Sequence, residues 1–170
     1  MYTCTYFQER NGLMSVETVR EYLKGFGLEG RVAEFSESSA TVELAAAVVG
    51  VIPARIAKTL SFKSPDGTAF LIVMAGDAKI DNRKFKDKFG FKAKMLTPDE
   101  AIELVGHPVG GVCPFAVKDN VTVYLDSSMQ RFSTVFPAAG SASSAVELSC
   151  DELFDASQAT EWVDVVKLPE

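Results

Sequence analysis

The clearest pattern in the sequence is a pair of apolar segments joined by a short turn. Between Ile56 and Lys63, residues of even number are mostly apolar and residues of odd number are small or polar, which is typical of a strand. Residues 69–75 are apolar throughout, which favours a central strand. Pro65 and Gly67 lie between the two segments, in positions that turns favour. The sequence therefore predicts a β-hairpin.

Lys58 is the polar residue that does not fit this alternation. It shares a predicted strand face with Ile56, Leu60 and Phe62, where a cation is not expected unless it lines a pocket. Two alternatives are a shift of one residue in the register and a lysine near the strand end that extends to water. Lys58 is therefore the first candidate functional residue.

Short helices alternate with further short strands along the rest of the chain. Threonine or aspartate residues such as Thr41, Asp81 and Thr97 stand where helices should begin, and glycines such as Gly50 and Gly90 stand where they should end. Helices are predicted at residues 16–26, 42–49, 82–89, 98–105 and 150–156. Strands or extended segments are predicted at residues 31–35, 91–96, 113–117, 120–125, 134–136, 145–148 and 162–168. This order predicts one α/β domain over residues 1–170, with a mixed, mostly antiparallel β-sheet surrounded by short helices.

Composition narrows the class of protein. Of the 170 residues, 47% are hydrophobic and 24% are charged, which is ordinary for a soluble globular domain. Uninterrupted apolar runs such as residues 44–49 are far too short to cross a bilayer, and the first residues show no secretory signal. Cys4, Cys113 and Cys150 are widely spaced and, with a single histidine, form no zinc-binding set. We therefore expect a cytoplasmic protein with no metal, no cofactor and no membrane partner.

The charge is acidic overall but unevenly distributed. A net charge of −6 argues against a broad basic surface for nonspecific nucleic-acid binding, and DNA is not an expected partner. Residues 79–94 are nevertheless strongly basic, so a phosphate backbone could be contacted at one place. The alternative is an ordinary solvated helix face. The basic residues are Lys79, Arg83, Lys84, Lys86, Lys88, Lys92 and Lys94.

A glycine- and proline-rich segment, Gly106–Phe115, is the second candidate site. It contains three glycines, two prolines, the only histidine, His107, and one cysteine, Cys113. Glycine lets another molecule approach the main chain and proline stiffens it, so free N–H groups of such a loop can face a ligand. The alternative is a tight connection between a helix and a strand.

Taken together, these segments resemble the YbaK/EbsC family, also known as the editing domain of prolyl-tRNA synthetase and its free-standing relatives. The resemblance rests on the strand 58–60, the strand end Ala75-Gly76-Asp77 and the loop 110–115, in matching order and spacing between about residues 15 and 155. It implies a single-domain α/β protein that hydrolyses mischarged aminoacyl-tRNA. Its partner would be the aminoacylated end of a tRNA, with an aminoacyl-tRNA synthetase as a second candidate partner.

The resemblance also implies roles for individual residues. Lys58 matches the strand lysine that the family needs for deacylation, and Gly110 and Pro114 match a Gly-x-x-x-Pro loop that holds the aminoacyl group and the terminal adenosine. The implied catalytic residues are Lys58, Gly110 and Gly111. The implied substrate-binding residues are Thr59, Val112, Cys113, Pro114, Phe115 and Asp126. The candidate tRNA contacts are Lys79, Arg83, Lys84 and Lys86.

The sequence departs from the family pattern in residues 140–148. Some members carry an aspartate or histidine there, whereas this chain offers only serines and Glu147. No side-chain general base is therefore evident, and the resemblance implies that a ribose hydroxyl of the tRNA helps to position the attacking water.

Three functions remain open at this point. Ester hydrolysis needs a stabilised oxyanion, for which N–H groups of the glycine loop and the charge of Lys58 are suited. The favoured function is a trans-editing hydrolase for misacylated tRNA, namely tRNA-Pro carrying alanine or cysteine. The second is a non-catalytic protein of the same fold that binds tRNA or a nucleotide-like ligand. The third is a hydrolase with Cys113 as nucleophile and His107 as base.

The residue types themselves disfavour the third function. A free cysteine such as Cys113 is more often a small hydrophobic residue than a catalyst. His107 lies just past a predicted helix end, where a capping or solvent-exposed position is expected. Asp126 follows a predicted strand, where it would either orient Lys58 or a loop amide or act as an ordinary turn aspartate.

Overall fold

The predicted hairpin forms the centre of the structure, a computed structural model that describes residues 16–36, 41–107 and 112–169. Strand β2 (Ile56–Lys63) pairs in antiparallel register with β3 (Ala69–Ala75), and every residue of β3 is buried. The turn between them is closed by Asp66, whose carboxylate accepts hydrogen bonds from the backbone and the side chain of Thr68. The hairpin prediction is therefore confirmed.

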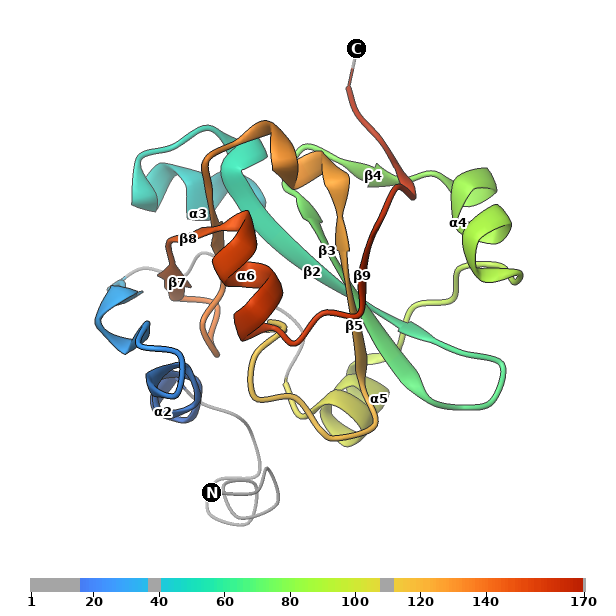
Figure 1. Cartoon of the computed structure of the whole chain (residues 1–170), viewed down its shortest axis with the longest axis horizontal. Coiled ribbons are helices and arrows are strands. Elements are labelled where there is room, and N and C mark those ends of the chain that lie inside the picture. Colours follow the sequence, from blue (N-terminus) through green and yellow to red (C-terminus); the bar gives the residue numbers. More distant parts are fainter. Residues whose placement is uncertain (1–15, 37–40, 108–111, 170) are drawn as a thin grey trace.

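Four further strands extend the hairpin into a six-stranded sheet with the order β8-β6-β2-β3-β5-β9 (Figure 1). Strand β5 is parallel to β3, β9 is parallel to β5, and β6 is parallel to β2, whereas β8 is antiparallel to β6. Two short antiparallel ladders, β1 with β7 and β4 with β10, lie outside this sheet. The added strands are β1 (Val32–Glu34), β4 (Lys79–Ile80), β5 (Thr122–Asp126), β6 (Thr134–Pro137), β7 (Ser144–Val146), β8 (Leu148–Ser149), β9 (Glu161–Val163) and β10 (Val166–Lys167).

The mixed sheet expected from the sequence is confirmed. Among the described residues, two strand pairs of the six-stranded sheet are antiparallel and three are parallel, so antiparallel pairs predominate only when the two separate ladders are counted as well. The parallel pairs arise because the chain leaves the hairpin through helical segments before it returns to the sheet.

Short helices surround the sheet, with α2 and α3 toward one side of the molecule and α4 toward the other (Figure 1). The predicted helix ends are confirmed where the sequence marked them: the Thr41 hydroxyl accepts a hydrogen bond from the Leu44 N–H, and Gly50 ends the helix with φ of 79°. The helices are α2 (Val16–Lys24), α3 (Val42–Val49), α4 (Asn82–Phe89), α5 (Pro98–Glu100) and α6 (Cys150–Ala156). Shorter turns of 3-10 helix are η1 (Glu29–Arg31), η2 (Pro53–Arg55) and η4 (Ser127–Arg131), and η3 (Ala101–Val105) is one turn of π-helix that continues α5.

The core lies on both faces of β3. At the hairpin end it is aromatic, with the ring centroids of Phe62 and Phe70 5.5 Å apart and those of Phe62 and Phe85 5.2 Å apart. Because Phe85 belongs to α4, these ring contacts fix the basic helix against the hairpin. None of the described helices is long and apolar enough to cross a membrane.

Two predicted extended segments are wrong. Residues 91–96 form only an isolated bridge, between Met95 and Phe62. Two backbone hydrogen bonds also join this segment to the second half of β2, at Ser61 and Lys63. Strand β6 pairs only with the first two residues of β2. Residues 113–117 are not a strand, because Ala116 adopts a left-handed φ of 53° and turns the chain.

Two other predicted strands are each divided. Residues 145–148 become β7 and β8, which pair with different strands on either side of Glu147. Residues 162–168 become β9 at the edge of the main sheet and β10 against β4. The chain leaves the sheet between them because the Val165 N–H donates to the Asp126 carboxylate at 2.9 Å and its C=O accepts from the Asp81 N–H at 2.9 Å.

Candidate active site

Lys58 lies inside the sheet, on β2 opposite Met74 of β3. Its side chain is half-buried, and its ammonium donates hydrogen bonds to two backbone carbonyls of the turn that follows β3, those of Gly76 (3.3 Å) and Ala78. The ammonium is thus bound to the protein rather than extended into solvent. An ammonium has three N–H groups, so one remains for a ligand oxygen.

The turn that binds Lys58 packs tightly against the preceding part of the chain. A Cβ atom at Gly76 would lie 2.2 Å from the carbonyl oxygen of Pro53 and 2.6 Å from Cγ1 of Val42. Distances this short leave no room for a side chain. Glycine is therefore required at the strand end Ala75-Gly76-Asp77, because the turn contacts both η2 and α3 there.

The same turn is tied to η4 through side chains. Asp77 accepts two hydrogen bonds from the guanidinium of Arg131, at 2.6 and 3.2 Å. The hydroxyl of Ser128 accepts a hydrogen bond from the Ala75 N–H at 3.1 Å. The turn that accepts the Lys58 ammonium is consequently fixed by residues from a segment more than fifty positions further along the chain.

Burial is the main influence on the charge of Lys58, and it lowers the pKa of the ammonium below its ordinary value. The carboxylates of Asp77 and Glu43 oppose this effect, and the ammonium of Lys79 adds to it. No ion pair within 4 Å involves Lys58 among the described residues. Lys58 is therefore a positive group that releases its proton more readily than an exposed lysine.

Thr59, the neighbouring substrate-binding candidate, is half-buried on β2 and pairs with Val73. Its hydroxyl oxygen is buried and makes no hydrogen bond within the described part of the chain. Such a group can accept or donate a hydrogen bond when a ligand or water reaches it.

The second candidate segment is described on both sides of residues 108–111. The catalytic candidates Gly110 and Gly111 fall in that gap, outside the described residues. Val112 is half-buried, and Cys113, Pro114 and Phe115 are buried. No hydrogen bond or ion pair joins Lys58 to residues 112–115 in the described part of the structure.

His107 is not at the surface, which corrects the expectation of a capping or solvent-exposed position. Its side chain is fully buried, with Nε2 2.9 Å from the carbonyl oxygen of Phe115 and 3.7 Å from the Cys113 sulfur. The reason is that the chain turns back at residue 116, which brings residues 113–115 over the end of η3. Its Nδ1 atom is buried without a hydrogen-bond partner among the described residues.

Two of the three other buried side chains of this segment, those of Cys113 and Phe115, belong to the core. Cys113 and Phe115 have no exposed surface, and the Phe115 ring lies 6.4 Å from that of Tyr22 on α2. Burial raises the pKa of Tyr22 to about 12, so its hydroxyl stays neutral and donates to the Ala156 carbonyl at 2.6 Å. Cys113 and Phe115 therefore pack into the core and support this segment from inside.

Asp126 acts as a turn aspartate, which is one of the two roles expected for it. One carboxylate oxygen accepts a hydrogen bond from the Ser128 N–H at 2.8 Å and the other accepts from the Val165 N–H at 2.9 Å. Its side chain is fully buried and does not contact Lys58. Asp126 begins η4 and thus acts on the Lys58 turn only through Ser128 and Arg131.

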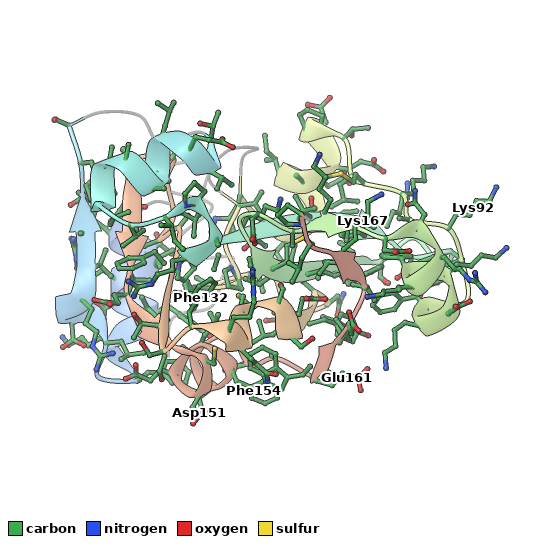
Figure 2. The ribbon with its side chains drawn as sticks, turned by 90° about the horizontal axis from the view of Figure 1, so that it is seen from above. Lys92, Phe132, Asp151, Phe154, Glu161 and Lys167 are labelled. Carbon is green, nitrogen blue, oxygen red and sulfur yellow. The ribbon has the colours of Figure 1, made fainter. Side chains whose placement is uncertain are left out.

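The four candidate tRNA contacts are exposed, on β4 and α4. The Lys84 ammonium already has partners within the protein, because it binds the Asp164 carboxylate at 3.1 Å and the Val166 carbonyl at 3.0 Å. Figure 2 shows Lys92, which follows the same helix, extending away from the body of the protein. Five basic residues on α4 or close to it in the chain form no ion pair with a described residue, namely Lys79, Arg83, Lys86, Lys92 and Lys94.

Residues 140–148 serve structural roles in this chain. The buried Ser144 hydroxyl accepts hydrogen bonds from the Ala139 and Ser141 N–H groups and donates to the Ser141 carbonyl. Glu147 is exposed and binds the Thr134 hydroxyl, with the Arg55 guanidinium 3.5 Å away.

Sequence reasoning missed the residues that support Lys58. Gly76 and Asp77 were visible only as part of a recognised strand end, and nothing in the sequence connects Arg131 or Ser128 to them. The position of Gly76 was the available sign, because a glycine directly after a fully apolar strand often marks a close approach of another part of the backbone.

Known proteins resemble this chain in both sequence and fold. Residues 36–156 match the model of the aminoacyl-tRNA editing domain. The chain is 52% identical over 154 residues to YwhH of Bacillus subtilis, an uncharacterized protein, covering 91% of this chain and 98% of that protein. It is 27% identical over 116 residues to EbsC of Enterococcus faecalis, named as a candidate Cys-tRNA(Pro)/Cys-tRNA(Cys) deacylase, covering 68% of this chain and 71% of EbsC.

A solved structure gives the same result for the fold. The crystal structure of a candidate trans-editing enzyme for prolyl tRNA synthetase superimposes with a TM-score of 0.81 and 27% identity, covering 89% of this chain and 96% of that one. The Lys58 strand and the glycine-rich segment thus lie within the matched residues 36–156, and the superposition covers most of the chain. This protein belongs to the aminoacyl-tRNA editing domain family.

Proposed function

We propose that this protein is a trans-editing hydrolase that deacylates misacylated tRNA, with tRNA-Pro carrying alanine or cysteine as the substrate. The observation that carries the proposal is the half-buried Lys58 ammonium, which two backbone carbonyls hold in place on a central strand. EbsC, with its name of a Cys-tRNA(Pro) and Cys-tRNA(Cys) deacylase, supports this choice of substrate.

In this proposal Lys58 supplies a fixed positive charge at the aminoacyl end. Its remaining N–H binds an oxygen of the terminal ribose or phosphate, and its charge favours the oxyanion that forms when water attacks the ester carbonyl. Because the turn fixes the ammonium before the substrate arrives, little reorganisation is needed in the transition state. Gly110 and Gly111 complete the proposal as backbone N–H donors to this oxyanion.

Phosphate contacts are assigned to the exposed cations of β4 and α4. Lys79, Arg83 and Lys86 are available, and Lys84 contributes less because Asp164 and the Val166 carbonyl already bind it. Such contacts give affinity without sequence recognition, so tRNA binding should weaken as salt is raised. An aminoacyl-tRNA synthetase would be a partner through the shared tRNA.

The test is release of amino acid from tRNA-Pro charged with alanine, cysteine, serine or proline. The wild type is expected to release alanine or cysteine, and Lys58→Ala to lose about 10²–10³ in rate, as for loss of one preorganised donor. The matched control is Lys24→Ala, since Lys24 is an exposed lysine in the last turn of α2. Binding of tRNA without release from any charged species would contradict the hydrolase and leave a non-catalytic tRNA-binding protein.

Cys113→Ala separates the cysteine-dependent hydrolase from the proposal. The Cys113 sulfur is buried and lies 3.7 Å from His107 Nε2 and from the Phe115 carbonyl oxygen. A sulfur enclosed in this way has no access to an ester carbonyl, so the variant is expected to keep its deacylation rate within a few fold. A loss as large as that of Lys58→Ala would instead support a catalytic cysteine.

A further inference from the structure

We propose that the Asp77–Arg131 ion pair is a positioning device for Lys58, which fixes the turn that binds the lysine and places one carboxylate charge beside it. The inference rests on the proposed function only for its effect on deacylation. Its geometric and electrostatic parts can be tested on the protein alone.

The first argument is the place of Asp77 in the turn. The two carbonyls that accept the Lys58 ammonium belong to Gly76 and Ala78, the residues on either side of Asp77. The Asp77 carboxylate accepts hydrogen bonds from both Nη atoms of Arg131, at 2.6 and 3.2 Å. A two-point contact fixes direction as well as distance, so the orientation of both carbonyls depends on this pair.

The second argument is that Arg131 is itself held. Its Nε donates to the Ser128 carbonyl at 2.8 Å, and its guanidinium lies 5.0 Å from the ring centroid of Phe132, which Figure 2 labels. Ser128 also accepts a hydrogen bond from the Ala75 N–H. The segment η4 therefore contacts the chain at two points, the end of β3 at Ala75 and the turn at Asp77, and a surface ion pair with this support is more than an incidental contact.

The third argument is charge. The ionisable groups that act on Lys58 are Asp77 on the turn, Glu43 on α3 and Lys79 on β4, and Asp77 has the strongest effect of the three. Arg131 is not one of these groups, but its guanidinium binds the Asp77 carboxylate and offsets part of the charge that this carboxylate presents to Lys58. Removing the carboxylate should therefore lower the pKa of Lys58, and removing the guanidinium should raise it.

These opposite signs distinguish a charge effect on Lys58 from simple bracing of the turn. If the pair only braced the turn, both substitutions would loosen it and let water reach Lys58, which would raise the pKa of the lysine in both variants. The structure predicts a decrease in Asp77→Asn and an increase in Arg131→Gln.

The experiment is a titration of Lys58 by ¹³C NMR in the full chain, with the resonance assigned by its disappearance in Lys58→Arg. Asp151→Asn is the matched control, because Asp151 is an exposed carboxylate on α6 (Figure 2) and should leave the pKa of Lys58 unchanged. Arg131→Lys, which keeps the charge but not the two-point contact, should stay near the wild-type pKa. A shift of the same sign in Asp77→Asn and Arg131→Gln, or none in either, would overturn the inference.

Deacylation gives the second readout. Arg131→Lys and Arg131→Gln are expected to lower kcat by about tenfold to a hundredfold with little change in KM, since the ammonium is displaced from the reacting ester. The pH dependence of kcat should shift in the same direction as the NMR titration. If the wild type releases no amino acid, the proposed function fails while the titration still decides the inference. An active wild type in which Asp77→Asn and Arg131→Gln leave the pKa of Lys58 unshifted contradicts the inference alone.

Discussion

At the scale of single residues, Gly76 is the position where the structure allows the least change. The Gly76→Ala substitution would put a Cβ atom 2.2 Å from the Pro53 carbonyl oxygen, so the turn or η2 must move. Overpacking of this kind costs about 1–3 kcal/mol, and it would also displace the carbonyls that bind Lys58. We expect a lower urea midpoint together with reduced deacylation, measured on the same preparation.

Gly30→Ala is the control for this prediction. No atom lies within 4 Å of a Cβ built at Gly30, and its φ is outside the left-handed region. The substitution should therefore change stability by less than about 1 kcal/mol, with either sign. Equal effects of the two alanine substitutions would show that the turn yields easily and that the close approach at Gly76 is unimportant.

At the scale of elements, the capping box at the start of α5 is predicted to respond to acid. Glu100 accepts from the Thr97 N–H and from the Lys63 ammonium, and the lysine contact is the main reason that its pKa falls from 4.5 to about 2. A carboxylate with a lowered pKa in the folded state stabilises above pH 4.5, and this contribution disappears as the pH falls to about 2. The stability difference between wild type and Glu100→Gln should therefore be largest near neutral pH and shrink over that range.

Urea unfolding at several pH values measures this difference. Asp99→Asn, which removes the exposed carboxylate next to Glu100, should keep the acid dependence of the wild type. A difference between wild type and Glu100→Gln that stays constant from pH 7 to pH 2 would mean that Lys63 does not hold Glu100 in solution.

Local rules predicted the elements that depend on neighbouring residues. The hairpin 56–75 and the caps at Thr41, Asp81 and Thr97 are set within a few positions of the sequence, and all are confirmed. The segment 91–96 has a strand-like pattern, but its place beside β2 depends on how much of that strand β6 covers, which no local pattern contains.

The candidate site shows the same division. Lys58 was identified because it breaks a two-residue alternation, which is a local observation. Its partners were not identified, because the Asp77–Arg131 contact joins residues 54 positions apart and exists only once β3 and η4 are adjacent. His107 was misplaced for the same reason: its burial depends on the turn at Ala116 and not on the helix end that precedes it.

At the scale of the whole molecule, Asp126 connects three parts of the fold. It ends β5, its carboxylate begins η4 through the Ser128 N–H, and it holds the C-terminal segment through the Val165 N–H. Val165 and Asp126 are fully buried, so water cannot replace the carboxylate. In Asp126→Ala two buried N–H donors lose their acceptor, each at a cost of about 1–3 kcal/mol.

We therefore expect Asp126→Ala to destabilise the protein by about 2–6 kcal/mol, a large part of the stability of an ordinary domain. Trp162, the only tryptophan, lies on β9 beside this contact and stacks on Phe154 at 6.0 Å, so its fluorescence during urea unfolding reports the loss. Asp164→Asn removes an exposed partner of Lys84 in the same segment and should cost less than about 1 kcal/mol. A stable Asp126→Ala protein that has lost deacylation would instead make Asp126 a substrate contact, because a carboxylate needed only for the fold cannot be removed without loss of stability.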